Sequence, residues 1–461
     1  MKLTLLIIKT LFVALLFVCV GTVNVAFSQS GILDSYIEEG FRNNLVLQQK
    51  NVSLDKATLA LKEAKSLYLP NIDVQGSYTT ATGGRSIQLP LGDLMNPVYA
   101  TLNQLTQSNN FPFLENQSID FLPKNYYDVH VRASVPILNT DLSFNKQINA
   151  QQIALKDFEV TIYKQELIKN IKHAYYNYLK AQKALSIYRS ALDLAEESKR
   201  VNERLLAAGK GLPAYVLRSN SEIEQVEAEL TQATQNVENS RLYFNALLNR
   251  NQAAVIDTLY NADLALSAAK QLLVTATDVS DREEIKSLEK LVDIHENLIS
   301  MNKKFSVPKV NGFIDLGSQA EDLRFNKQSR YAMLGVQMNM PLFNGNRNRF
   351  KIQQSMLDLK DSQLNLEWSK NQLTLSAQVA QNNLRSVYKK YESSLKQLES
   401  ASAYQRLIDK GYKAGTHTYI ETIDARNQLT AARLSSLVNK YQVLTAAADL
   451  EREISKPKTS L

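Results

Sequence analysis

The hydrophobic and polar positions of the chain predict two very long helices. The stretches 140–208 and 346–410 contain neither proline nor glycine, the two residues that most often interrupt a helix. In the second stretch an apolar side chain recurs every seven residues from Ile352 to Val387, a spacing typical of coiled coils. We therefore expect helices over residues 140–208 and 346–411.

Shorter helical patterns flank the long ones. Because the shorter patterns are about half as long, two of them placed end to end would match one long helix. The sequence therefore predicts long helices packed beside coaxial pairs of short ones. The shorter helices are expected at residues 32–67, 214–249, 281–304 and 418–454.

Four other segments alternate apolar and polar side chains, as strands do. Tyr127, Val129 and Val131, for example, alternate with Asp128 and His130. Each segment has about 10 residues, the length of a tilted strand in an outer-membrane barrel. An ordinary sandwich strand is the alternative for any one segment, but four of them in a largely helical chain favour a barrel. The strands are expected at residues 70–80, 126–136, 309–318 and 331–341.

The order of these elements occurs twice along the chain. Val135-Pro136, at the end of one predicted strand, matches Met340-Pro341 at an offset of 205 residues. Ala208-Gly209 matches Ala414-Gly415 at an offset of 206 residues. Self-similarity of this kind indicates an internal duplication. The expected domains are a first repeat at 29–250, a connecting equatorial segment at 251–280, a second repeat at 281–455 and a C-terminal tail at 456–461.

The first residues have the features of a secretory signal peptide. Lys2 and Lys9 accompany an apolar run at 11–20, and Ala26-Phe27-Ser28 has the small-x-small form of a cleavage site. The signal peptide is therefore predicted at 1–28. A membrane anchor and a lipoprotein acceptor at Cys19 are the alternatives. Because Cys19 is the only cysteine, its removal would leave no thiol or disulfide chemistry.

Charge and composition exclude several classes of function. The formal net charge is +7, which is mild for this length, and no run of lysine and arginine indicates nucleic-acid binding. The four histidines lie far apart and lack the spacing of metal ligands. Neither a phosphate-binding loop nor a nucleophile elbow is present. We therefore expect no enzyme activity, no cofactor, no metal and no nucleic-acid partner.

Four strands cannot close a membrane barrel on their own. The smallest closed outer-membrane barrels have about eight strands, and an open edge in lipid would leave backbone groups without hydrogen bonds. The strands must therefore be shared between copies of the chain. Three copies would supply twelve strands, although the pattern does not by itself determine the number three.

The stretch Tyr412–Asp424, with the sequence YKAGTHTYIETID, resembles the tip turn of the TolC family of outer-membrane efflux proteins. In that turn a tyrosine is followed by a small-Gly-Thr segment, a basic residue and two acids. The resemblance extends to the duplication and to the junctions between strand and helix. It implies a mainly α chain with a transmembrane β-barrel: a homotrimer with a 12-stranded barrel in the outer membrane, in contact with its lipid, continuous with a long α-helical barrel in the periplasm.

The same resemblance implies partners and a function. It predicts an iris-like closed end, docking to a periplasmic adaptor, and an inner-membrane pump that supplies the energy. The chain would be the passive outer-membrane exit duct of a tripartite system for small molecules. An exit duct for type I protein secretion is the nearest alternative, and a periplasmic coiled-coil scaffold without a pore is an alternative of another class.

Five residues near the turns are candidates for the gate. Glu421 and Asp424 lie three residues apart, on one side of a helix, and in a trimer they could form two rings of carboxylates; compensation of the helix dipole is the alternative. By resemblance Tyr412 would be the latch of the closed iris. His417 stands where the family often has an arginine, and Tyr215 where an acidic partner can occur. Both differences argue against a permanent ionic latch, and His417 raises the possibility of a pH-sensitive one.

The two turns themselves are candidates for adaptor contact. Ala208-Gly209-Lys210 and Ala414-Gly415-Thr416 match the exposed turns that meet the adaptor in the family. Ordinary turn chemistry is the alternative for both. Residues 83–125, which join the first two strands, contain several phenylalanines and prolines and are far longer than the matching connection at 320–330. We expect an expanded loop there, on the side that a barrel turns to the outside of the cell. A loop that folds over the pore, or that contacts neighbours or surface ligands, is the alternative.

Overall fold

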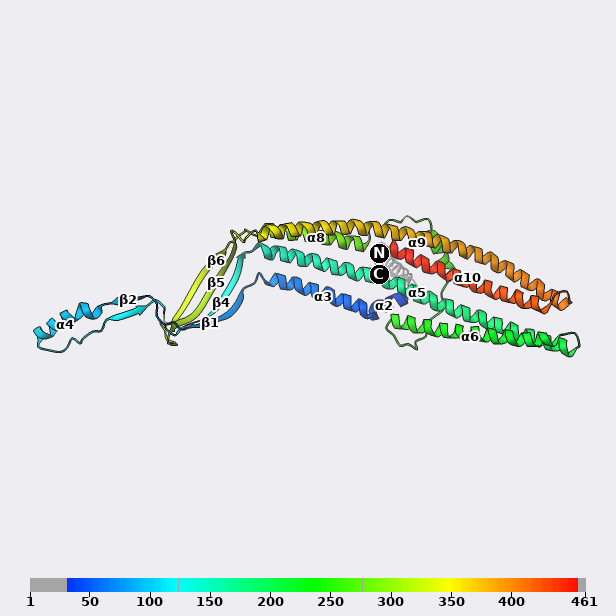
Figure 1. The fold of residues 1–461 in the computed structure, drawn as a ribbon, viewed down its shortest axis with the longest axis horizontal. Coiled ribbons are helices and arrows are strands. Elements are labelled where there is room, and N and C mark those ends of the chain that lie inside the picture. The colour runs from blue at the N-terminus through cyan, green and yellow to red at the C-terminus, as the bar shows by residue number, and fades with distance from the viewer. Residues whose placement is uncertain (1–30, 123, 276, 455–461) are drawn as a thin grey trace, which may run out of the picture. The chain divides into compact units, whose positions relative to one another are not determined.

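The computed structural model describes residues 31–122, 124–275 and 277–454. The predicted signal peptide (1–28) and the C-terminal tail (456–461) lie outside these ranges. The chain divides into two compact units: one comprises Met1–Leu54, Lys156–Glu289 and Asn365–Leu461, and the other comprises Asp55–Leu155 and Lys290–Leu364. Figure 1 shows the elements of both units.

The four helices that flank the turns fall into two pairs of equal length. Helices α5 (Thr140–Ala207) and α9 (Arg347–Ala414) both have 68 residues, and α6 (Pro213–Leu247) and α10 (Tyr419–Glu453) both have 35. Helix α9 continues three residues beyond the predicted end at Gly411. A single glycine inside a helix costs only about 1 kcal/mol, so Gly411 is accommodated within the helix.

The helix predicted over residues 32–67 is wrong as a single element. The structure has α2 (Ile32–Asn43) and α3 (Leu45–Ser66), separated by Asn44 in an extended conformation with φ −67° and ψ 119°. The Asn44 side chain accepts a hydrogen bond from the Leu47 backbone N–H at 3.0 Å and donates one to the Leu247 carbonyl at 3.3 Å. These bonds satisfy the polar groups at the break, which lacks the proline or glycine that would have marked it in the sequence.

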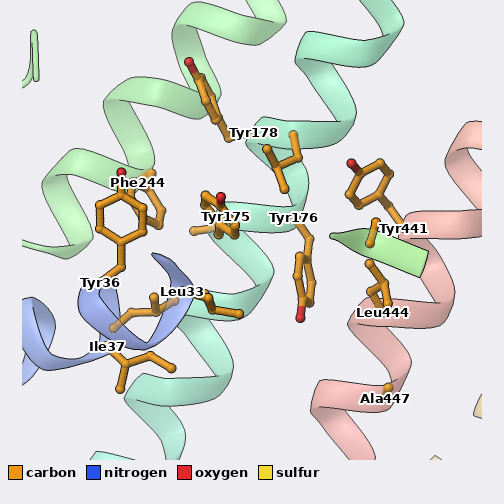
Figure 2. Packing of buried hydrophobic residues seen from close by; sticks show 14 of the residues in the cluster. Leu33, Tyr36, Ile37, Tyr175, Tyr176, Tyr178, Phe244, Tyr441, Leu444 and Ala447 are labelled. Atoms are coloured by element: carbon orange, nitrogen blue, oxygen red, sulfur yellow. The ribbon is translucent and has the colours of Figure 1, made fainter. Parts of the chain in front are cut away.

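The first unit is built around a cluster of buried aromatic and aliphatic side chains. Residues of α2, α5, α6 and α10 converge there, among them Tyr36, Tyr175, Phe244 and Leu444 (Figure 2). Burial of such side chains stabilises a fold by about 2 kcal/mol each. The hydroxyl of Tyr175 donates to the Asp257 carbonyl at 2.9 Å, and that of Tyr36 accepts from the Asp257 backbone N–H at 2.8 Å.

The described part of the segment between the repeats contains a short helix that the sequence did not predict. Helix α7 (Ala262–Leu272) begins at Asn261, whose side chain accepts hydrogen bonds from the backbone N–H groups of Asp263 and Leu264. Helix α8 (Glu283–Lys303) then opens the second repeat. Within the described parts of the chain, no helix combines the length and apolar character needed to cross a membrane.

The second unit contains a four-stranded antiparallel sheet. Its strands β1 (Asn71–Thr79), β4 (Tyr126–Leu138), β5 (Lys309–Glu321) and β6 (Arg330–Asn339) follow one another across the sheet in this order. They occupy the four alternating segments of the sequence. The edge strands β1 and β6 each have a single neighbour among the described residues.

The two faces of the sheet differ in polarity. Ile72, Ala133, Ile314 and Leu334 are paired in register across the sheet, and the three larger members of this row are exposed. On the other face Arg132 donates two hydrogen bonds of 2.7 Å to Asp315. One exposed apolar face and one polar face are the arrangement of an outer-membrane strand.

Residues 83–125 are not the plain loop that the sequence predicted. They contain β2 (Ser86–Leu89), helix α4 (Leu91–Thr106) and β3 (Gln117–Asp120), and β2 pairs with β3 in antiparallel register. The sequence signal for a helix was obscured because Pro97 lies inside α4, where a proline removes one backbone hydrogen bond. We call residues 83–125 the insert.

Candidate gate at the turns of the long helices

The two long helices end in the same type of turn. Gly209 and Gly415 have φ values of +72° and +78°, a conformation that glycine adopts without strain. After α9, the Gly415 backbone N–H donates to the Tyr412 carbonyl at 3.0 Å, and the Thr416 backbone N–H donates to the Gly411 carbonyl at 2.9 Å. The turn after α5 has the equivalent pair of bonds. These two hydrogen bonds at each turn satisfy carbonyl groups in the last turn of the helix.

Helix α10 begins with a capping box formed by Thr418 and Glu421. The Glu421 backbone N–H donates to the Thr418 hydroxyl at 3.4 Å, and the Thr418 backbone N–H donates to the Glu421 carboxylate at 2.6 Å. The backbone hydrogen bond from Thr418, followed by the one from its side chain, lowers the pKa of Glu421. Such reciprocal bonds determine where the helix starts.

His417 and Asp424 lie on either side of this capping box. The Nδ1 atom of His417 is 3.3 Å from the Glu421 carboxylate. Asp424 is exposed and accepts a hydrogen bond from Gln428 at 2.8 Å. Of the two acids predicted to act together, Glu421 is therefore engaged in the cap, whereas Asp424 is turned to solvent with one amide partner.

A buried chain of hydrogen bonds connects the first helical hairpin, α5–α6, with the second, α9–α10. The Tyr412 hydroxyl donates to Asn202 at 2.7 Å, and Asn202 donates to the Ser219 hydroxyl at 2.9 Å. The Ser219 hydroxyl is 2.8 Å from that of Tyr419. Ser219 and Tyr419 are fully buried. Burial is the largest cause of the raised pKa of Tyr412, which favours the neutral phenol that donates this bond.

An ion pair continues this polar chain. Arg426 on α10 lies 3.8 Å from Glu222 on α6, and both side chains are less than a tenth exposed. Arg426 also donates to the Ser198 hydroxyl at 3.0 Å, and Tyr419 donates to Glu222 at 3.4 Å. Charged groups are buried at this depth only when they are paired and hydrogen-bonded. We call Asn202, Ser219, Glu222, Tyr412, Tyr419 and Arg426 the tip network.

The predicted site residues fall into separate groups. Tyr412 belongs to the tip network, and the Tyr215 ring lies 5.3 Å from that of Tyr419, the fully buried centre of the network. His417, Glu421 and Asp424 lie at the start of α10, outside it. The turns at 208–210 and 414–416 are exposed.

Five members of the tip network were missed by sequence reasoning. Arg426, for example, lies among the buried residues Ile423, Ala425 and Leu429. A charged side chain within an apolar pattern was therefore the available signal. The set missed comprises Asn202, Ser219, Glu222, Tyr419 and Arg426. Among the residues that the structure describes, no group of three His, Cys, Asp or Glu side chains could hold a metal ion.

The chain is similar to known proteins in both sequence and fold. The chain is 24% identical over 286 residues to the cobalt-zinc-cadmium resistance protein CzcC of Cupriavidus metallidurans, covering 61% of this chain and 66% of CzcC. It is 22% identical over 356 residues to the alkaline protease secretion protein AprF of Pseudomonas aeruginosa, covering 72% of this chain and 70% of AprF. The crystal structure of the outer membrane protein VceC of Vibrio cholerae superimposes with a TM-score of 0.70 at 14% identity, over 92% of this chain and 96% of VceC.

The family comparison covers both repeats. The outer membrane efflux protein family matches residues 37–250 and 279–454, which is most of the chain. The match is interrupted in the segment that connects the repeats. The two matched segments contain the four strands of the sheet and the helices α5, α6, α9 and α10 that flank the turns. The chain therefore belongs to the outer membrane efflux protein family, and it is a protein of the outer membrane that extends into the periplasm.

Proposed function

We propose that this chain forms a homotrimeric, passive exit duct through which small molecules leave the periplasm for the outside of the cell. The observation that carries the proposal is the four-stranded sheet, with one exposed apolar face, one polar face and two edges that have a single neighbour among the described residues. In lipid every backbone group needs a hydrogen-bond partner, so β1 of one copy has to pair with β6 of the next.

We further propose that the duct works with a periplasmic adaptor and an inner-membrane pump. The similarity to CzcC, a resistance protein for cobalt, zinc and cadmium, supports small solutes as the cargo. The similarity to AprF, a protein of alkaline protease secretion, supports secretion of a protein as the second candidate. The turns at 208–210 and 414–416 are the proposed adaptor contacts, since they are exposed and share one geometry.

The start of α10 is the proposed inner gate. Asp424 is exposed and accepts a single hydrogen bond from Gln428, so three copies around an axis would form a ring of carboxylates that attracts cations. Glu421 and His417 would form a second ring, weaker in charge when His417 is protonated. Tyr412 and Tyr215 would hold the hairpins in the closed arrangement through their contacts at the tip network.

Conductance in planar bilayers tests the duct directly. The purified oligomer is expected to give small, cation-selective currents, and replacement of Asp424 by Asn should reduce the preference for cations. Gln428→Glu, one turn further along α10, is the matched control because it adds a carboxylate and should raise that preference. An oligomer that gives no current, even after Tyr412→Ala loosens the gate, would support the scaffold without a pore.

The choice between the two cargoes requires a cellular experiment. A deletion strain should become more sensitive to metal ions or to small toxic molecules, and the unmodified chain should restore resistance. Loss of a secreted protein without any change in sensitivity would favour the secretion duct instead.

A further inference from the structure

Helix α4 of the insert turns its apolar side to solvent. Leu91, Leu94, Val98 and Leu105 follow one another at intervals of three, four and seven residues, and all four are exposed, Leu94 to 65% and Leu105 to 76%. Residues at these intervals lie on one side of a helix. An apolar stripe of this kind normally packs against another surface.

The opposite side of α4 is already occupied, and its contacts are polar. Asn96 donates to the Leu114 carbonyl at 2.9 Å and accepts from the Leu114 backbone N–H at 2.8 Å. Asn103 makes the same pair of bonds with Phe111, at 2.8 Å and 3.1 Å. The returning chain is thus attached to the helix by amide hydrogen bonds, and the apolar stripe remains available to another surface.

The charge of α4 restricts what that surface can be. Its only charged residue is Asp93, which accepts a hydrogen bond from the Asn116 side chain at 2.9 Å. Helix α4 has no lysine or arginine that could bind the phosphates of a lipid headgroup. An uncharged stripe can, however, meet the identical stripe of another copy without repulsion between like charges.

The position of the insert in the chain would place it close to a neighbouring copy. It follows β1 directly, and β1 is an edge strand with β4 as its one neighbour among the described residues. In the proposed trimer the free edge of β1 meets the neighbouring copy, so every insert begins next to a seam between copies. The other ends of the strands continue into the periplasmic helices, which leaves the inserts at the outer end of the barrel.

We propose that the apolar stripe of α4, formed by Leu91, Leu94, Val98 and Leu105, packs against the same stripe in neighbouring copies of this chain. The inserts thereby form a cap at the outer end of the barrel. This inference rests on the trimer of the proposed function for the number of copies, and on the stripe for the contact itself.

Cysteine crosslinking of the full-length protein in outer membranes tests the contact. Val98→Cys, in the middle of the stripe, is expected to give a covalent dimer under a mild oxidant. Ala100→Cys is the matched control, because Ala100 is also exposed but lies on another side of α4. Since a disulfide requires Cβ atoms about 4 Å apart, Val98→Cys should give roughly tenfold more dimer than Ala100→Cys. The unmodified chain controls for Cys19.

A second variant separates packing from chance collision. Adding Leu94→Asp to Val98→Cys places like charges in the stripe and should abolish most of the crosslinked dimer while the native oligomer persists. Equal crosslinking at both cysteines, no crosslinking in an intact oligomer, or an adduct with a different protein would each overturn the α4 contact. If the unmodified chain is monomeric, the trimeric duct fails together with the contact.

Discussion

Glu421 and Asp424 lie one turn apart on α10, yet their surroundings give them different roles. Glu421 completes the capping box with Thr418, and this explains its lowered pKa without any neighbouring copy. Asp424 accepts one hydrogen bond from Gln428. In the proposed gate, the ring of Asp424 should therefore attract cations more strongly than the ring of Glu421, because Glu421 also forms the cap of the helix.

The buried pair of Glu222 and Arg426 permits a double-mutant cycle. Arg426→Met should lower the stability of the fold by about 3 kcal/mol, because Glu222 would keep a charge without its partner. Glu222→Gln combined with Arg426→Met removes both charges, so the double variant should be more stable than Arg426→Met alone. Thermal unfolding followed by circular dichroism measures both effects. If the double variant lost as much as the sum of the single variants, the pair would not be coupled.

The lowered pKa of Glu284 predicts how the stability of the fold depends on pH in acid. Burial alone would raise its pKa, but hydrogen bonds from Arg282 and Arg452 outweigh burial and lower the pKa from 4.5 to about 2. The folded state therefore gains stability above pH 4.5, by about 3 kcal/mol. This gain is lost progressively as the pH falls from there towards 2.

Replacing Glu284 by Gln should therefore lower stability at neutral pH and make it depend less on pH in the acid range. Chemical unfolding at a series of pH values measures this dependence. Glu289→Gln is the control, because Glu289 pairs with Lys370 at the surface, where an ion pair contributes little. The same acid profile in both variants would contradict the role assigned to Glu284.

The break between helices α2 and α3 depends on one side chain. Asn44→Ala removes the acceptor for the Leu47 backbone N–H and for the Tyr163 hydroxyl, and it should lower stability by about 1 to 2 kcal/mol. Asn44→Asp keeps an oxygen acceptor for both groups and loses only the hydrogen bond to the Leu247 carbonyl, so it should lose less stability. Unfolding midpoints of the two variants compare them. A more stable Asn44→Ala variant would mean that a continuous helix is preferred.

In the assembled protein, the exposed apolar face of the sheet should be in contact with lipid. Leu334→Arg places a charge on that face of β6, and Gln337→Arg places one on the other face. A charge towards the middle of the bilayer costs about 2 to 4 kcal/mol, so Leu334→Arg should reduce the amount of folded, heat-modifiable oligomer in the outer membrane. Gln337→Arg should reduce it far less. Equal yields would contradict the assignment of the faces.

The periodic features of this protein could be predicted from its sequence. The absence of proline and glycine predicts α5 and α9, and alternation predicts the four strands. The offset of about 206 residues between glycines of the turns indicates a duplication. These features are local, since each follows from backbone conformation and from the period of burial along one segment. The resemblance at Tyr412–Asp424 led to the family for the same reason, because a turn is encoded by neighbouring residues.

Which side chains meet could be seen only once the helices were packed together. Asn202 and Tyr412 are 210 residues apart in the chain but are joined by a hydrogen bond, and Asn44 interrupts a helix because Leu247 and Tyr163 lie beside it. Helix α4 resembled a loop because it contains Pro97 and makes its internal contacts through amides rather than through an apolar core. Contacts between distant segments depend on packing of whole helices, for which no single segment of sequence carries the information.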